Sequence, residues 1–262
     1  MNEVTYADVL LWVAFPYVAA ASFIVGPILR FRYDKFGWTS RSSQTYETKL
    51  LKWGSPMFHY GILGVFAGHV VGLLIPREWL EFFGITEHMY HLGATWLGTI
   101  VALITIAGMV ILLSRRGAIR RVARVTTVMD VVMYFFLASA IILGTIAVIQ
   151  FQVLGAGYDY RGTISPWSRS LILFRPDASL MVGVPLMFQL HALTATALFL
   201  IWPYTRLVHV MSVPLMYLFR PYVVYRSRDA HRGARAVRPG WEPSKLPATR
   251  QSRQKQPVGR DR

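Results

Sequence analysis

The stretch MFHYGILGVFAGHVVG, residues 57–72, decides how the chain folds. It is apolar apart from His59 and His69, and it lies in a run of about the 20 residues that cross a bilayer. A charged side chain inside such a span costs about 2.5–3.5 kcal/mol or more, so an ionisable residue there marks a functional site by default. The two histidines therefore predict a membrane helix that carries chemistry.

A second apolar stretch has the same character. FQLHALTATALFLIWPYTRLVHVMSVP, residues 188–214, contains His191 and His209. One histidine in a span is more often a hydrogen-bonded helix contact than a ligand, but two matched pairs are poorly explained in that way. Neutral imidazole is an axial ligand of haem iron. The four histidines together predict two bis-histidine haem sites.

The composition is that of a membrane protein. Of the 262 residues, 54% are hydrophobic and 16% charged, whereas a soluble domain carries about 25% charged residues. The chain has no cysteine, which excludes disulfides, cysteine-ligated iron–sulfur clusters, thiolate catalysis and c-type haem attachment. The N-terminus begins acidic (MNEVTYADVL), so we expect the first apolar segment to be a span rather than a cleaved signal peptide.

Five apolar segments predict an all-α bundle of five transmembrane helices in one domain, residues 1–228. The segments are 7–29, 54–75, 89–113, 127–150 and 184–211. Residues 229–262 are rich in Arg, Pro, Gln and Ser, and we expect a basic, disordered tail.

Basic residues predict the orientation. Nearly all of the 28 Lys and Arg fall in the connections 30–52 and 114–126, at Arg206 and in residues 220–262. The exceptions are Arg77, Arg161, Arg169 and Arg175. The positive-inside rule then places the N-terminus outside and the C-terminus in the cytoplasm. The net charge of +15 is thus explained by topology and the tail, and we expect lipid rather than nucleic acid as a partner.

Helix geometry predicts how the histidines pair. His59 and His69 are ten residues apart, about 15 Å along a helix, and an 18-residue spacing brings His191 and His209 back to one face after five turns. Pro203 between them should kink the helix, so this alignment is approximate. The two spans run antiparallel, so topology pairs His59 with His209 and His69 with His191.

Four other features carry expectations. Arg206 is one turn before His209, where it could meet a haem propionate or anionic headgroups. Thr126 or Thr127 can cap the span that starts there, and Asp130 in its first turn is expected to be a capping charge rather than a proton relay. Pro16 lies inside the first span, which is tolerated where neighbours satisfy the freed carbonyl. Residues 167–177 (WSRSLILFRPD) predict a short amphipathic helix on the membrane surface.

Glycines in the stretch 57–72 form a smooth stripe that admits a neighbouring helix or a porphyrin plane. They are Gly61, Gly64, Gly68 and Gly72.

The chain resembles the gamma subunit of respiratory nitrate reductases, a membrane cytochrome b that passes quinol electrons to a cytoplasmic catalytic dimer. The resemblance covers nearly the whole chain to about residue 228. It is densest in FHYGILGVFAGHVVG, LFLIWPYTRLVHVMSVP and SRRGAIRRVARVTT. It implies two haem b groups, with proximal ligands His59 and His209 and distal ligands His69 and His191. It also implies iron–sulfur and molybdenum-containing partner subunits, and a place in a bacterial or archaeal cytoplasmic membrane.

The resemblance further implies a quinol site near the distal haem, on the outer side. Some members have a lysine at the start of the third span that contacts the quinol, and this chain has none. His88 or His91 would take that place, with Gly68 beside His69 as a further candidate. A neutral imidazole is a suitable acceptor for the protons of a quinol. The alternative for both histidines is an interfacial position without a role.

Other functions remain open from the residues alone. A related di-haem cytochrome could serve another reductase, of sulfite or heterodisulfide type. A transporter could use intramembrane histidines for protons or metal ions, although Asp130 is the one acidic residue within a predicted span beyond those at the chain start. A membrane anchor without haem would leave the four histidines unexplained.

Overall fold

The computed structural model describes residues 4–34, 38, 42–155 and 157–212, and these contain helices and turns but no strand. The chain divides into two units, 1–213 and 214–262, and only the first falls within the described residues. The predicted tail, 229–262, and the predicted domain boundary at 228 lie outside them.

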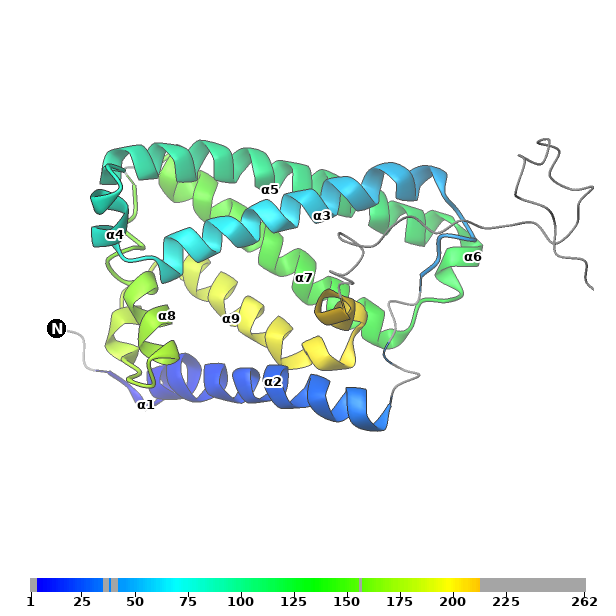
Figure 1. Ribbon diagram of the computed structural model, residues 1–262, viewed down its shortest axis with the longest axis horizontal. Helices are drawn as coiled ribbons and strands as arrows, with labels where there is room; N and C mark the ends of the chain where they lie inside the picture. Colours follow the sequence, from blue (N-terminus) through cyan, green and yellow to red (C-terminus); the bar gives the residue numbers. More distant parts are fainter. Residues whose placement is uncertain (1–3, 35–37, 39–41, 156, 213–262) are drawn as a thin grey trace, which may run out of the picture. The chain divides into compact units, whose positions relative to one another are not determined.

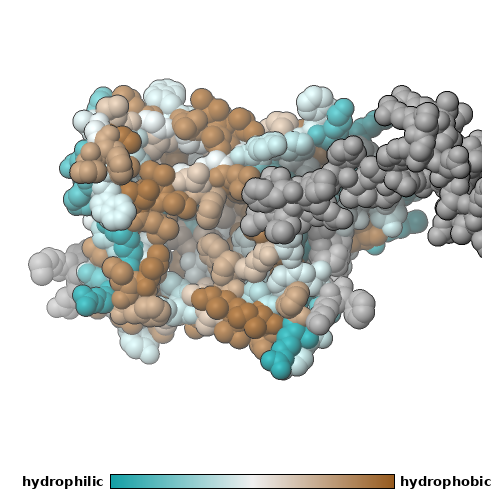
Figure 2. All heavy atoms as spheres, in the orientation of Figure 1, coloured by the Kyte–Doolittle hydropathy of each residue, from teal (hydrophilic) through white to brown (hydrophobic). Residues whose placement is uncertain are grey.

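Five helical segments are long and apolar enough to cross a membrane, as predicted. They are Tyr6–Tyr33, Lys49–Leu74, Glu87–Ala118, Val128–Val153 and Leu186–Tyr204. Figure 1 shows them side by side as α2 (Phe15–Tyr33), α3 (Lys49–His69), α5 (Glu87–Ala118), α7 (Val128–Ala147) and α9 (Leu186–Ile201). In Figure 2, hydrophobic atoms dominate the middle of the visible face and hydrophilic atoms gather toward its two ends.

Short elements cover the two ends of the bundle. The α8 end carries α1 (Tyr6–Val9), α4 (Arg77–Phe82), α8 (Ile164–Ile172) and η4 (Ala178–Met181). The opposite α6 end carries α6 (Arg120–Ala123) (Figure 1). The connection between the second and third spans contains α4.

Glycines let α3 and α5 approach closely. A Cβ at Gly61 would lie 2.4 Å from Oγ1 of Thr105, and one at Gly108 would lie 2.4 Å from the backbone nitrogen of Phe58. Gly64 likewise faces Val101. Most of the glycine stripe therefore serves helix packing, which places His59 and His69 on a helix fixed by α5.

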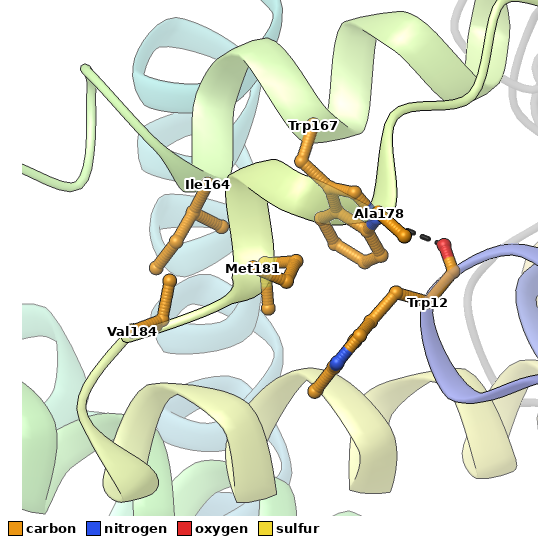
Figure 3. Packing of buried hydrophobic residues seen from close by; sticks show 6 residues of the cluster. All are labelled: Trp12, Ile164, Trp167, Ala178, Met181 and Val184. Carbon is orange, nitrogen blue, oxygen red and sulfur yellow. Dashed lines mark hydrogen bonds between the residues drawn. The ribbon is translucent and has the colours of Figure 1, made fainter. Parts of the chain in front are cut away.

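The first span contains Pro16, and the structure shows how its missing N–H is accommodated. A π-helical turn, η1 (Leu10–Ala14), precedes it, and the carbonyl of Trp12 accepts a hydrogen bond from Nε1 of Trp167 at 2.9 Å (Figure 3). In an α-helix that carbonyl would pair with residue 16. The expectation that a neighbour satisfies the freed carbonyl is confirmed.

The helix expected within 167–177 begins earlier and is not confined to the surface. It is α8, and its Trp167 lies in a buried cluster with Trp12, Met181 and Val184 (Figure 3). Trp12 and Trp167 meet edge to face with ring centroids 5.8 Å apart. The apolar face of α8 thus closes the α8 end of the bundle.

Candidate functional site

The four histidines meet in two pairs, the ones that antiparallel topology predicted. The ring centroids of His59 and His209 are 6.1 Å apart, and those of His69 and His191 are 5.8 Å apart. His59 and His69 are both on α3, whereas their partners come from the chain segment 186–212. The two pairs are therefore about 15 Å apart along α3, at 1.5 Å per residue.

Backbone carbonyls fix each imidazole. Nδ1 of His59 lies 2.8 Å from the carbonyl oxygen of Ser55, and Nδ1 of His69 lies 2.8 Å from that of Val65. Nδ1 of His209 lies 2.6 Å from the carbonyl oxygen of Arg206. A carbonyl can only accept, so these contacts hold the proton on Nδ1 and leave the lone pair on Nε2, the arrangement of a metal-ligating histidine.

His191 is held by a different helix. Its Nδ1 lies 2.8 Å from the carbonyl oxygen of Ala140 on α7. One turn further along α7, a Cβ at Gly144 would lie 2.8 Å from Cε1 of His191. Ala140 and Gly144 thus orient His191, and sequence analysis did not identify either. The sequence signal that could have found this contact is Gly144, a glycine inside the span 127–150, which has no histidine of its own and so leaves room for one from another helix.

The residues fit haem better than a protein-only metal site. Zinc takes three or four protein ligands, and the described residues contain no group of three or more His, Cys, Asp or Glu side chains that could hold a metal ion. A haem iron needs only two axial ligands, because the porphyrin supplies the rest. Two metal–nitrogen bonds of about 2.0–2.1 Å, plus about 1.1 Å from each nitrogen to its ring centre, give roughly 6.3 Å between centroids. Both pairs are close to that value.

His209 is not on the same helix as His191, contrary to expectation. The predicted span 184–211 ends as an α-helix at Ile201, and two 3₁₀ segments follow, η5 (Trp202–Tyr204) and η6 (Arg206–Ser212). Pro203 cannot continue the α-helical hydrogen bonding. The disruption expected at Pro203 is therefore more than a kink: the two histidines are not aligned on one helix, and the turn at Pro203 presents His209 to α3.

Arg206 pairs with Asp130. Its Nε lies 2.7 Å from Oδ1 and its NH2 2.5 Å from Oδ2, a bidentate contact that is largely buried. Asp130 also caps α7, because its carboxylate accepts from the Thr127 backbone and the Thr127 hydroxyl accepts from the Asp130 backbone. The expected capping role is confirmed, and the ion pair joins α7 to η6 next to His209.

An ionic and aromatic cluster lies at the α8 end, at the start of α5. Its members are Arg77, Glu87, Tyr90, His91, Asp159, Tyr160 and Arg161. NH1 of Arg161 donates to Oε2 of Glu87 at 3.0 Å, and Nε2 of His91 lies 3.2 Å from Oε1. The other candidate, His88, is exposed. We call this set the Glu87 cluster.

Gly68 differs from the rest of the glycine stripe. No atom lies within 4 Å of a Cβ built on it, whereas the Cβ position of Gly72 lies 2.7 Å from the Tyr90 hydroxyl. A flat ring could therefore approach α3 at Gly68, directly beside His69.

The sequence matches the family described as "Nitrate reductase gamma subunit" over residues 8–228. The chain belongs to this family. It is 44% identical over 220 residues to the nitrate reductase gamma chain of Bacillus subtilis, which covers 84% of this chain and 98% of that protein. It is 34% identical over 226 residues to the respiratory nitrate reductase 2 gamma chain of Escherichia coli, covering 86% and 99%.

A longer relative also matches. The chain is 48% identical over 233 residues to the nitrate reductase-like protein NarX of Mycobacterium tuberculosis, but these residues make up 88% of this chain and only 36% of that protein. The family assignment confirms the resemblance seen in the sequence. All four paired histidines, the Glu87 cluster and Gly68 lie within the matched residues.

Proposed function

We propose that this chain is the membrane cytochrome b subunit of a quinol-oxidising respiratory nitrate reductase. One observation carries the proposal. The four histidines form two pairs whose ring centroids are 6.1 and 5.8 Å apart, and Nδ1 of each ring contacts a backbone carbonyl oxygen. The family assignment supplies the class of complex. His59 and His209 would hold the proximal haem b, and His69 and His191 the distal one.

The chain's residues do three things in this function. They present Nε2 of four neutral imidazoles, they separate the two centres by about 15 Å along α3, and they exclude water with apolar spans. Haem supplies one-electron redox chemistry when bound. Electrons from quinol would pass from the distal to the proximal site and on to iron–sulfur and molybdenum-containing subunits.

The α8 end would face outward and the α6 end the cytoplasm. Support comes from the basic residues at the α6 end, where α5 ends with Arg115 and Arg116 and α6 begins with Arg120 and Arg121. The membrane would be the cytoplasmic membrane of a bacterium or archaeon. A reporter fused after Arg228 should be active only in the cytoplasm. Activity in the periplasm would contradict this orientation, and with it the inward direction of electron flow.

Quinol would bind near the distal pair, on the outer side. Gly68 leaves space beside His69, and His88 and His91 are at the start of α5. Arg206 was expected at a haem propionate or at anionic headgroups, and its bidentate contact with Asp130 instead supports a role in fixing η6.

The test is reduction of the haems by a quinol in membranes that contain the full complex. We expect a quinol to reduce both b components and nitrate to reoxidise them. Haems that only dithionite reduces would refute quinol oxidation. Reoxidation by a different acceptor, with none by nitrate, would favour a related cytochrome serving another reductase.

A further inference from the structure

The carboxylate of Glu87 contacts two guanidinium groups at the α8 end. The guanidinium of Arg161 donates to its Oε2 at 3.0 Å and to the carbonyl of Ile75 at 3.0 Å, and Arg161 is only 3% exposed. A buried cation requires a nearby anion. Arg77 on α4 adds a second positive charge, with Nε 3.7 Å from Oε1 of Glu87, and Arg77 also pairs with Asp159.

The second oxygen of this carboxylate is an unused acceptor. Oε1 of Glu87 is buried and has no hydrogen-bond partner among the residues that the structure describes. Nε2 of His91, one turn along α5, lies 3.2 Å away but is not aligned as a hydrogen bond. A small rotation of the imidazole would direct an Nε2 proton at Oε1.

The cluster borders the space beside His69. The Tyr90 hydroxyl lies over Gly72, which is one turn, or about 6 Å, beyond Gly68 on α3. Tyr90 and Tyr160 share a hydrogen bond of 2.7 Å, and the ring of His91 lies 5.8 Å from Tyr90 and 6.3 Å from Tyr160. Burial raises the pKa of Tyr160, so its hydroxyl remains protonated and neutral. The imidazole of His91 lies between the tyrosine pair and Glu87.

We propose that His91 and Glu87 form the proton-release pair of the quinol site. The inference rests on the proposed function. A quinol that becomes a quinone loses two electrons and two protons, and a haem held by His69 and His191 would supply the one-electron acceptor. Each proton passes to the imidazole of His91, then from Nε2 to Oε1 of Glu87, and then to outer water. The Glu87 side chain is 31% exposed, which gives it access to that water.

After each proton is released to water, the pair is again a neutral imidazole and a carboxylate, so it can accept the second proton in the same way as the first. His88 is next to this pair in sequence but is exposed to the surroundings of α5. The sequence offered His88 and His91 equally as quinol-site candidates, and only His91 contacts Glu87. The charged and titratable groups that face the pair are Arg77 on α4, Tyr90 on α5, and Asp159, Tyr160 and Arg161 in the connection before α8.

The experiment measures haem reduction by duroquinol in stopped flow, with the full complex in membranes, between about pH 5 and pH 8. The variants are Glu87→Gln and His91→Gln, and Glu81→Gln on α4 is the matched control at an exposed glutamate. We expect Glu87→Gln and His91→Gln to slow reduction at neutral pH on the order of 100-fold. The pH dependence of the wild-type rate should change in His91→Gln, which has no imidazole to accept the proton. Glu87→Asp, which keeps the carboxylate, should recover part of the rate.

Dithionite reduction gives the haem content of each variant. It therefore distinguishes a variant that has lost a haem from one that keeps both haems but releases protons slowly. Wild-type rates and pH profiles in both variants, with quinol still reducing the wild-type haems, would refute the proton-release pair and leave the proposed function standing. Failure of quinol to reduce the wild-type haems would refute the proposed function itself.

Discussion

Nδ1 of His191 on α9 lies 2.8 Å from the carbonyl oxygen of Ala140 on α7. His59, His69 and His209 instead contact carbonyls of their own segments, three or four residues earlier. The orientation of His191 therefore depends on how α7 packs against α9. The ring fits there because Gly144 has no side chain.

Gly144→Ala should weaken haem binding at the His69–His191 pair and leave the other pair intact. The new Cβ would lie 2.8 Å from Cε1 and 3.0 Å from Nδ1 of His191, so the ring must turn away from Ala140. Loss of such an outer contact lowers affinity for the bound metal roughly 10- to 100-fold. Low-temperature reduced-minus-oxidised spectra should show one b component shifted or lost. Gly98→Ala on α5, where nothing lies within 4 Å, is the control, and identical spectra for both variants would contradict this role of Gly144.

Replacing either member of a histidine pair should remove the same spectral component. His59→Ala and His209→Ala should resemble each other, and His69→Ala and His191→Ala should resemble each other but differ from the first two. The reason is that each pair shares one centre, with rings 6.1 or 5.8 Å apart. Folded proteins in which His59→Ala and His209→Ala remove different components would show that the pairing is wrong.

Asp130→Ala should destabilise the α6 end and release η6. The Asp130 and Arg206 side chains are only 4% and 12% exposed, and removing one partner of a buried pair costs about 3–5 kcal/mol. Thermal unfolding of the solubilised protein measures the loss, and the component assigned to His59 and His209 should weaken first. The double variant Asp130→Leu, Arg206→Met should lose less than the two single changes added together. A fully additive double variant would indicate that the pair is not coupled.

Trp167→Phe should cost about 1–3 kcal/mol of stability, because it leaves the buried carbonyl of Trp12 without a donor. Pro16→Ala supplies an N–H one turn after that carbonyl. In the Pro16→Ala background, Trp167→Phe should therefore cost less, as measured by thermal unfolding of the four proteins in a double-mutant cycle. If Trp167→Phe lowers the free energy of unfolding equally in both backgrounds, the Trp12–Trp167 contact does not compensate for Pro16.

The sequence predicts the spans and the histidine pairs because both follow from simple periodicity. Apolar runs of about 20 residues define membrane helices, and antiparallel spans can bring His59 only to His209 and His69 only to His191. The cap at Thr127 and Asp130 is also a local consequence of residue type. Pro16 predicts that the carbonyl one turn before it needs another donor, but not that Trp167, 155 positions away, supplies it.

The sequence could not predict contacts that depend on how distant helices pack. Pro203 ends α9, and the resulting 3₁₀ segments carry His209 in a direction that an ideal helix does not give. The support of His191 by Ala140 and Gly144 crosses from α9 to α7, and the approach of Arg161 to Glu87 joins residues 74 positions apart. The difference between His88 and His91 depends on that last contact.

The most direct test of the central claim is the haem content of the purified chain, by pyridine haemochrome assay against protein concentration, for the wild type and His69→Ala. The account predicts two haem b per chain in the wild type and one, at the His59–His209 pair, in His69→Ala. A wild-type chain that folds and binds one haem or none, or a His69→Ala variant that retains two, would contradict it.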